Sequence, residues 1–333
     1  MGRVAHRAEG AEPVVSSIWI DPRPASTTTA KPLIVATLIG EGRISLGLQC
    51  FESWIRCVPF DELLVYDDGT LTDASRLQIA HLSPRIRIVG KQEADQRFAD
   101  SFDHKRFPLL SKLRNHFPLG RKIVDVPAFS KGWINYIDSD IYFYRPVGVL
   151  WTQQIKCKKF WMMKDCQNMY STKPWQLLPG MGTPLPQKAN SGLISCEANC
   201  YDPAFLESVL QRDLSQQSTW TWVIEQTLWA ALGWRSKLEF YDPNLIGLAT
   251  DENRAKIGRM AALHWAGLFR SQFEPSRSRG DGKAHAQLDQ RVTSLAFEPA
   301  VRLTWGHVAR SLLQYQFKHT LRHLSSILNK GTN

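Results

Sequence analysis

The sequence predicts a doubly wound α/β fold, in which a mixed sheet carries helices on both faces. Short runs rich in apolar and β-branched residues alternate with amphipathic helical patterns along residues 31–270. This alternation favours strands joined by helical crossovers. Acidic residues directly follow two of the runs, and sheets of this kind bind ligands at the carboxyl ends of their strands. The fold class therefore indicates where a functional site should lie.

The first half of this region shows three strand patterns. Residues 33–38 (LIVATL) are apolar throughout, which is typical of a strand buried on both faces. Residues 63–66 (LLVY) run into turn residues and predict a second strand. A third strand is expected at residues 86–89, and helices are expected at residues 46–57 and 107–117.

The second half begins with residues 133–138 (WINYID), a central strand pattern that ends in acidic residues. Further strands are expected at residues 160–164 and 192–196. Between them, residues 173–188 contain Pro and Gly over a length that predicts a functional loop. Helices are expected at residues 203–211 and 222–232.

Both ends of the chain differ from this central domain. Residues 1–30 lack periodicity, so we expect a flexible leader. Residues 271–333 are expected to form a basic helical appendage, because leucines and basic side chains alternate at helical spacing over residues 301–328. The appendage packs against the domain in one interpretation and contacts a membrane surface in the other.

Composition limits the partners and the location. The net charge of +10 and the pI near 9.4 indicate an anionic partner, which nucleotide phosphates, an acidic membrane surface or nucleic acid would satisfy. The chain shows neither a signal-peptide pattern nor an apolar run of about eighteen residues. We therefore expect a cytoplasmic location, with peripheral contact to the inner face of the membrane as the alternative.

Asp138-Ser139-Asp140 closes the strand at residues 133–138. Hard divalent cations prefer carboxylate oxygens and bridge phosphates, so two aspartates around one small residue suit a metal-diphosphate clamp. Such a triplet is elsewhere often only a turn, and its place at the end of a central strand favours the metal site. The motif therefore predicts a divalent cation as the cofactor.

From this motif onward the sequence resembles the GT-A glycosyltransferases, whose D-x-D motif holds Mn²⁺ or Mg²⁺ against the diphosphate of a nucleotide sugar. The resemblance thus implies Mn²⁺ or Mg²⁺ as the cofactor. Asn190-Ser191-Gly192 resembles the N-S-G segment of retaining family 8-type enzymes. Glu225-Gln226 is similar to their D-Q pair, and the segment from His264 to Gly267 is similar to their H-x-x-G element. The chain departs from the family in having Glu225 for Asp and in lacking Lys-Pro-Trp after Gly267.

The resemblance implies a single GT-A-like, Rossmann-like domain that transfers a hexose from a nucleotide-diphosphate sugar, uridine-linked, to an acceptor hydroxyl. The acceptor would be a saccharide, a lipid-linked group or a protein. The metal ligands would be Asp138, Asp140 and His264. Donor-sugar contacts would come from Asn190, Ser191 and Gly192, and Glu225 and Gln226 would form the catalytic pair next to an oxocarbenium-like centre.

Four further residues have a functional and a structural interpretation. Asp67 and Asp68 either form a tight turn after a strand or bind the uridine or ribose of the nucleotide, as in the similar D-D-G-S element of inverting family 2 enzymes. Lys112 and Arg114 either contact the departing diphosphate or are merely solvated on a helix surface.

Three alternatives stay open. An inverting family 2-like transferase would use Glu225 as its general base. A nucleic-acid-binding protein would explain the positive charge, but the basic residues are spread without a binding motif, so no nucleic-acid partner is expected. A catalytically inactive sugar-nucleotide binder of the same fold is the third alternative.

Overall fold

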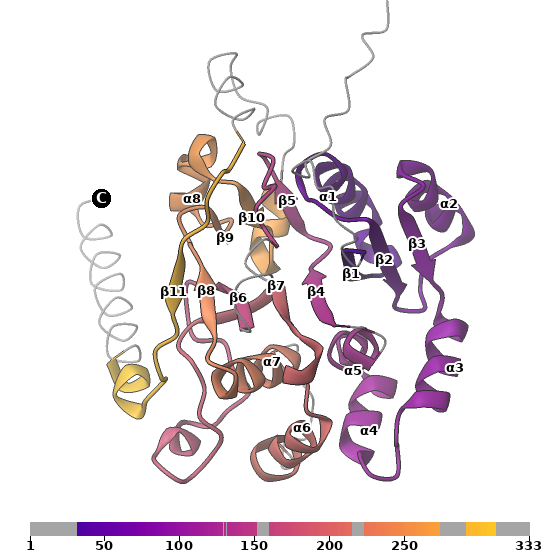
Figure 1. Cartoon of the computed structure of the whole chain (residues 1–333). Helices are drawn as coiled ribbons and strands as arrows, with labels where there is room; N and C mark the ends of the chain where they lie inside the picture. Colours follow the sequence, from indigo (N-terminus) through magenta and orange to yellow (C-terminus); the bar gives the residue numbers. More distant parts are fainter. Residues whose placement is uncertain are drawn as a thin grey trace, which may run out of the picture.

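The computed structural model describes residues 32–128, 130, 132–151, 160–214, 223–273 and 291–310. Its centre is an eight-stranded sheet with the strand order β11-β8-β6-β7-β4-β1-β2-β3 (Figure 1). The strands are β1 (Ile34–Ile39), β2 (Glu62–Asp67), β3 (Ile86–Val89), β4 (Trp133–Ile137), β6 (Phe160–Lys164), β7 (Ala189–Glu197), β8 (Glu239–Tyr241) and β11 (Phe297–Pro299). All run in one direction except β7 and β11.

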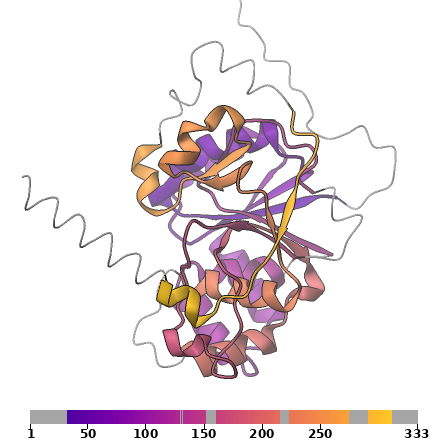
Figure 2. The ribbon, with the colours of Figure 1, turned by 90° about the vertical axis from the view of Figure 1, so that its left-hand side faces the viewer.

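Helices cover both faces of the sheet, and Figure 2 shows the resulting three layers. The first face carries α1 (Ile44–Cys57) and α2 (Asp73–Leu82). The second carries α3 (Lys91–Ser101), α4 (Pro108–His116), α5 (Gly120–Ala128), α6 (Pro203–Val209) and α7 (Ile224–Arg235). The expected mixed α/β sheet with helices on both faces is therefore confirmed.

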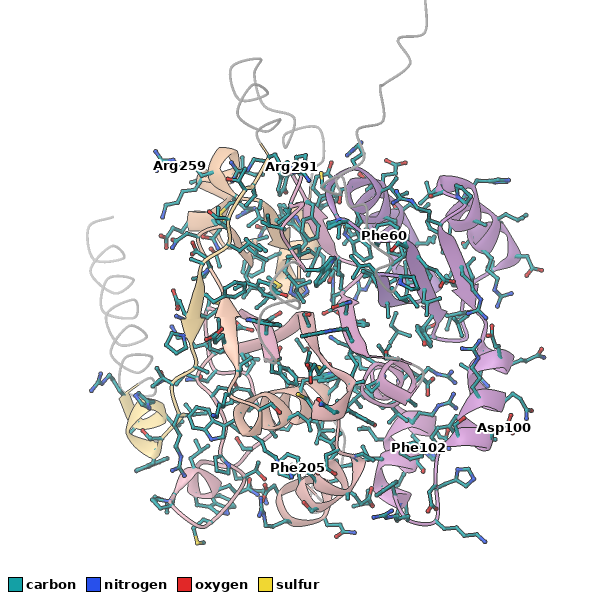
Figure 3. The ribbon with its side chains drawn as sticks, in the orientation of Figure 1. Phe60, Asp100, Phe102, Phe205, Arg259 and Arg291 are labelled. Carbon is teal, nitrogen blue, oxygen red and sulfur yellow. The ribbon has the colours of Figure 1, made fainter. Side chains whose placement is uncertain are left out.

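Two buried apolar clusters separate the layers. Side chains alternate along a strand, so Val35 and Ile39 of β1 enter one cluster while Ala36 and Leu38 enter the other. Figure 3 labels a member of each, Phe60 and Phe102. The sheet is thus buried on both sides, which explains the near-continuous apolar runs of its parallel strands.

A second, three-stranded sheet lies on the α1 face. It consists of β5 (Ile141–Phe143), β10 (Ala262–His264) and β9 (Ile246–Leu248), with α8 (Asp251–Ala255) between β9 and β10. The indole N–H of Trp54 on α1 donates to the Ile141 carbonyl over 2.6 Å. Since β5 follows β4 in the chain, this sheet brings β10 next to the end of β4.

All the strands and helices expected within residues 31–270 are present, with boundaries displaced by at most three residues. Residues 173–188 contain only a short 3-10 helix, Pro174–Leu177, as expected for a loop. Further elements were not expected from the sequence: α2, α3, α5, α8, β5 and β8 to β11. The missed strands are only three residues long, and α3 buries only Ala94 and Phe98 along its length.

The expected C-terminal appendage is corrected in part. β11 pairs with β8 at the edge of the large sheet, so this part of residues 271–333 belongs to the sheet and not to a helical appendage. The helix expected from residue 301 begins at residue 305, because Arg302 forms a β-bridge with Pro186. The expected leader and residues 311–328 lie outside the described residues. In the described part, none of the helices has the length and apolarity needed to cross a membrane.

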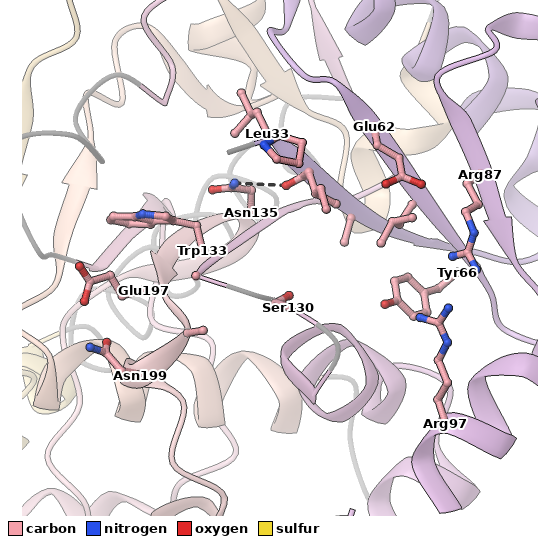
Figure 4. Close-up of a pocket in the computed structure, with 16 residues that line it drawn as sticks. Leu33, Glu62, Tyr66, Arg87, Arg97, Ser130, Trp133, Asn135, Glu197 and Asn199 are labelled. Atoms are coloured by element: carbon pink, nitrogen blue, oxygen red, sulfur yellow. Dashed lines mark hydrogen bonds between the residues drawn. The ribbon is translucent and has the colours of Figure 1, made fainter. Parts of the chain in front are cut away.

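The large sheet has a hollow at each end of its parallel strands. One lies at the carboxyl ends, next to Gly40, Asp68 and Asp138. The other, of about 740 Å³, lies where the same strands begin. Figure 4 shows this second hollow, with Trp133 and Glu197 on one side and Arg87 and Arg97 on the other.

Candidate active site

The hollow at the carboxyl ends is a cleft of about 540 Å³. Strand ends of β1, β2 and β4 meet there with the start of β7, the start of α7 and the end of β10. Eight of the residues singled out in the sequence line this cleft: Asp68, Asp138, Asp140, Asn190, Ser191, Glu225, Gln226 and His264. The fold thus brings together five motifs that are far apart in the chain.

Asp138 and Asp140 occupy the turn between β4 and β5. The Asp138 N–H donates to the Gly192 carbonyl over 2.7 Å, and the Ile141 N–H donates to the Asp138 carbonyl over 3.0 Å. β10 pairs with β5 in a register that sets His264 opposite Ile141. The imidazole therefore lies beside the carboxylate of Asp140.

These three side chains form a compact group of metal-ligating atoms. His264 Nε2 lies 2.9 Å from Asp140 Oδ1 and 3.6 Å from Asp138 Oδ2. One ligand atom from each residue lies within 4.8 Å of the other two. Two carboxylates and one imidazole are a donor set that suits Mn²⁺ or Mg²⁺. The residues present therefore fit the expected divalent cation.

Asn190 fixes the orientation of the imidazole. Its Oδ1 accepts from the Gly192 N–H at 2.9 Å and lies 3.0 Å from His264 Nδ1, while its Nδ2 donates to Asp165 over 2.9 Å. His264 Nδ1 is thus the nitrogen that carries a hydrogen toward Asn190, and Nε2 faces the two aspartates. Supporting contacts of this kind are typical of histidine ligands.

The start of β7 is irregular at the site. Pairing between β6 and β7 shifts from Met162 with Ile194 to Met163 with Asn190, so the three intervening residues of β7 bulge. A bulge redirects side chains and is common next to functional sites. Here it also lets the ring of His264 approach the backbone: a Cβ on Gly192 would lie 2.5 Å from His264 Nδ1.

Lys122 of α5 is a central residue of the site that the analysis of the sequence missed. Its side chain is only 1% exposed, and its Nζ lies 3.0 Å from Asp138 Oδ1 and 3.2 Å from Glu225 Oε1. Nζ also donates to Ser191 Oγ over 3.1 Å. Burial opposes the charged form, but the two carboxylates raise the pKa of Lys122 above its usual value. One ammonium thus lies between two carboxylates.

Glu225 and Gln226 begin α7 beneath the cleft. The Ser191 hydroxyl donates to Glu225 Oε2 over 3.1 Å, and Gln226 Nε2 donates to the Met169 carbonyl over 2.8 Å. Burial raises the pKa of Glu225 to about 7, and Lys122 offsets this only in part. Lys122 has two carboxylate partners whereas Glu225 has one cation, which is why burial dominates at Glu225.

Arg270 supplies a second cation, also unforeseen from the sequence. Its Nε donates to Asp140 Oδ2 over 2.7 Å, whereas Lys122 contacts Asp138. Burial opposes ionisation, but His264 and Arg270 together lower the pKa of Asp140. Asp140 in turn raises the pKa of His264 against the effect of burial. Arg43 lines the same wall of the cleft.

Asp67 does not line the cleft. Its Oδ1 accepts from the N–H of Gly69 over 2.7 Å and from that of Leu71 over 3.2 Å. Its Oδ2 pairs with Arg76 over 2.7 Å. Asp67 therefore stabilises the turn after β2, and of the two adjacent aspartates only Asp68 faces the cleft.

Lys112 and Arg114 also lie away from the cleft, which corrects their expected role as diphosphate ligands. Lys112 is exposed on α4. The Arg114 guanidinium is 3% exposed and pairs with Asp125 over 2.9 Å and with Asp95 over 2.5 Å. Arg114 therefore joins α4 to α5 and α3, and it helps to place α5, which carries Lys122.

The comparisons with known proteins give structural matches only. No family model matches the sequence. No curated protein sequence matches it. Among solved structures, the bifunctional glycosyltransferase WbbM is 12% identical with a TM-score of 0.45, and the alignment covers 76% of this chain and 49% of that chain. The chain thus spans about half the length of WbbM.

Two further structures match over a similar share of this chain. The galactosyltransferase LgtC, in complex with donor and acceptor sugar analogues, is 11% identical with a TM-score of 0.45, over 77% of this chain and 95% of that chain. The glycosyltransferase GlyE from Streptococcus pneumoniae TIGR4 is 10% identical with a TM-score of 0.42, over 78% and 62%. All three are glycosyltransferases, the class that the sequence resembles.

Gly192→Ala tests whether His264 binds a metal. The added methyl group would meet the ring at 2.5 Å, so the imidazole must shift. We expect the Mn²⁺ affinity, measured by isothermal titration calorimetry, to fall by about 10- to 100-fold. The control is Gly90→Ala, where nothing lies within 4 Å of the added Cβ. Equal Mn²⁺ affinities for the two variants would show that His264 is not a ligand.

Glu225→Gln tests the electrostatics beneath the cleft. The pKa of Glu225 rises from its ordinary value of 4.5 to about 7 on folding, so folding takes up a proton between these pH values. The free energy of unfolding of the wild type therefore falls as the pH rises through this window. The amide does not titrate.

Relative to the wild type, the Glu225→Gln variant should thus gain up to about 3 kcal/mol between about pH 5 and about pH 8. Urea denaturation at the two pH values measures this gain. A stability difference that is the same at both pH values would contradict the raised pKa of Glu225.

Proposed function

We propose that the chain is a metal-dependent glycosyltransferase that transfers a hexose from a nucleotide-diphosphate sugar, uridine-linked, to an acceptor hydroxyl. The observation that carries this proposal is the convergence of Asp138, Asp140 and His264 in a cleft at the carboxyl ends of the central strands. Two cations of the protein contact the group, Lys122 at Asp138 and Arg270 at Asp140. During transfer from such a donor, a nucleotide diphosphate departs and gains negative charge. Cations in the cleft would stabilise this charge.

The metal ligands would be Asp138, Asp140 and His264, and a divalent cation held there supplies positive charge against the leaving diphosphate. Arg270 is 32% exposed, so its guanidinium can turn from Asp140 toward a phosphate oxygen. Arg43 lies on the same wall and adds a second guanidinium. Fixed cations of this kind stabilise charge without reorganisation during the reaction.

The nucleoside end of the donor is assigned to Asp68 and the end of β1. A Cβ on Gly40 would lie 2.1 Å from Asp68 Oδ2, so only glycine lets this carboxylate occupy the cleft wall. Asp68 Oδ1 already accepts from the N–H of Thr70 over 3.0 Å, which holds the carboxylate in place. Oδ2 is then the oxygen that suits a ribose hydroxyl.

The donor sugar is assigned to the floor formed by Asn190, Ser191, Glu225 and Gln226. Gln226 is held by Met169, and Glu225 is held by Lys122 and Ser191, so both side chains are preorganised. Their dipole and charge lie where an oxocarbenium-like centre would develop. Because the Glu225 carboxylate is already paired with Lys122 and Ser191, it suits a role in positioning the donor sugar better than a role as a free base. We therefore prefer the retaining reaction, in which the product keeps the anomeric configuration of the donor.

A second candidate is an inverting transferase with Glu225 as general base. The observation that favours it is the pKa of Glu225 near 7, since a base is most effective when its pKa is close to the working pH. In this reaction Glu225 would leave Lys122 and accept the proton of the acceptor hydroxyl. The two candidates share the metal site and differ only at the anomeric carbon.

Asp140→Asn tests the proposed chemistry. A panel of uridine and guanosine diphosphate sugars is screened for Mn²⁺-dependent hydrolysis, and the variant should lose turnover of the preferred donor by at least about 100-fold, because it loses a metal ligand. The matched control is Asp251→Asn, a side chain 95% exposed on α8. Wild-type turnover in the Asp140→Asn variant would refute the metal assignment, and donor binding without hydrolysis would identify an inactive binder.

The anomeric configuration of the product separates the two stereochemical candidates. With the donor found by the panel, proton NMR of the first-formed glycoside should show the anomeric configuration of the donor. An inverted product would instead support Glu225 as the base, and Glu225→Gln should then abolish transfer without abolishing donor binding.

A further inference from the structure

Large apolar side chains gather on one surface away from the cleft. Among the residues that the structure describes, seven large hydrophobic side chains are exposed, and five of them belong to residues 175–181 and 301–305. They are Trp175 (53% exposed), Leu178 (41%), Met181 (57%), Val301 (57%) and Trp305 (43%). None of the five lines the candidate active site. We call this group the apolar surface.

The two segments that carry the apolar surface are held together by the backbone. The Gln187 N–H donates to the Val301 carbonyl over 2.7 Å, and the Leu303 N–H donates to the Leu185 carbonyl over 2.7 Å. Figures 1 and 2 both show the yellow helix at residues 305–310 beside the pink loop between β6 and β7. The five side chains therefore belong to one region of the molecule, although more than a hundred residues separate the segments in sequence.

The two segments that carry the apolar surface contain charged residues of a single sign. Residues 171–188 and 300–310 contain no Asp or Glu, but they contain Lys173, Lys188, Arg302 and Arg310. The Lys173 ammonium lies 5.1 Å from the centre of the Trp175 ring, so a cation and an exposed aromatic ring are in direct contact on this surface. The apolar surface is thus bordered by positive charge alone within these segments.

We propose that the apolar surface docks this protein on a membrane that contains anionic phospholipid. Tryptophans favour the boundary between headgroups and acyl chains, and lysines and arginines beside them attract anionic headgroups. Tryptophan and methionine are also enriched at protein interfaces, but lysine, which here borders the exposed tryptophan, is depleted there. A membrane with anionic headgroups suits both the tryptophans and the lysine. This inference does not depend on the glycosyltransferase chemistry, since lipid binding and turnover are measured separately.

Co-sedimentation with lipid vesicles tests this proposal. The full-length protein should sediment with vesicles of phosphatidylcholine containing phosphatidylglycerol, and on the order of tenfold less with vesicles of phosphatidylcholine alone. The double variant Trp175→Ser/Met181→Ser should lower binding to the anionic vesicles by about tenfold, because it removes apolar area from the surface. Lys173→Gln should lower the binding by about threefold and weaken its dependence on salt.

Leu77→Ser is the matched control, because Leu77 is 60% exposed on α2 and lies outside the apolar surface. This variant should bind anionic vesicles as the wild type does. Three outcomes would overturn the proposal: no wild-type binding to anionic vesicles, equal binding to both kinds of vesicle, or unchanged binding by the Trp175→Ser/Met181→Ser variant. A dimer that this double variant converts to a monomer, without vesicle binding by the wild type, would show that the surface joins two copies of the chain.

Discussion

Three carboxylates in one buried cleft constrain everything else about the site. Asp138, Asp140 and Glu225 lie close enough to share their cationic partners, and the energy of like charges rises steeply when water is excluded. Lys122 compensates Asp138 and Glu225 at once, while Arg270 and His264 compensate Asp140. Buried charged groups are stable only when they have partners of opposite charge. A cluster of three carboxylates is therefore costly to the fold, and such clusters are common at functional sites. A divalent cation bound between Asp138 and Asp140 would compensate this negative charge further.

A few local backbone features bring the residues of this cluster together. The strand β4 ends at Asp138 at the edge of the sheet, and pairing of β10 with β5 places His264 beside it. The bulge of β7 turns Asn190 toward the imidazole of His264. Gly192 leaves room for the ring. Each of these is a backbone feature, so the fold itself sets the positions of these side chains.

The sequence allowed the fold class and eight of the residues that line the cleft to be predicted, because both leave local patterns. Apolar runs of a buried parallel sheet are visible without a structure, and so is an acidic triplet directly after such a run. Lys122 and Arg270 leave no such pattern. A buried lysine is recognised only from its partners, and these come from β4 and α7, which are distant in sequence. The role expected for Arg114 was wrong because its partner Asp125 lies on α5, a helix that was not predicted from the sequence. Short edge strands such as β11 were missed because three residues carry too little periodicity.

The central claim is that Asp138, Asp140 and His264 together bind one divalent cation. Crystals soaked with MnCl₂ and uridine diphosphate, measured at a wavelength where manganese scatters anomalously, locate the metal directly. We expect one strong anomalous peak within about 2.0–2.3 Å of His264 Nε2 and of an oxygen of each aspartate, with diphosphate oxygens completing the coordination. Nucleotide density in the cleft without a peak at these three side chains, or a peak elsewhere on the protein, would contradict metal binding by Asp138, Asp140 and His264.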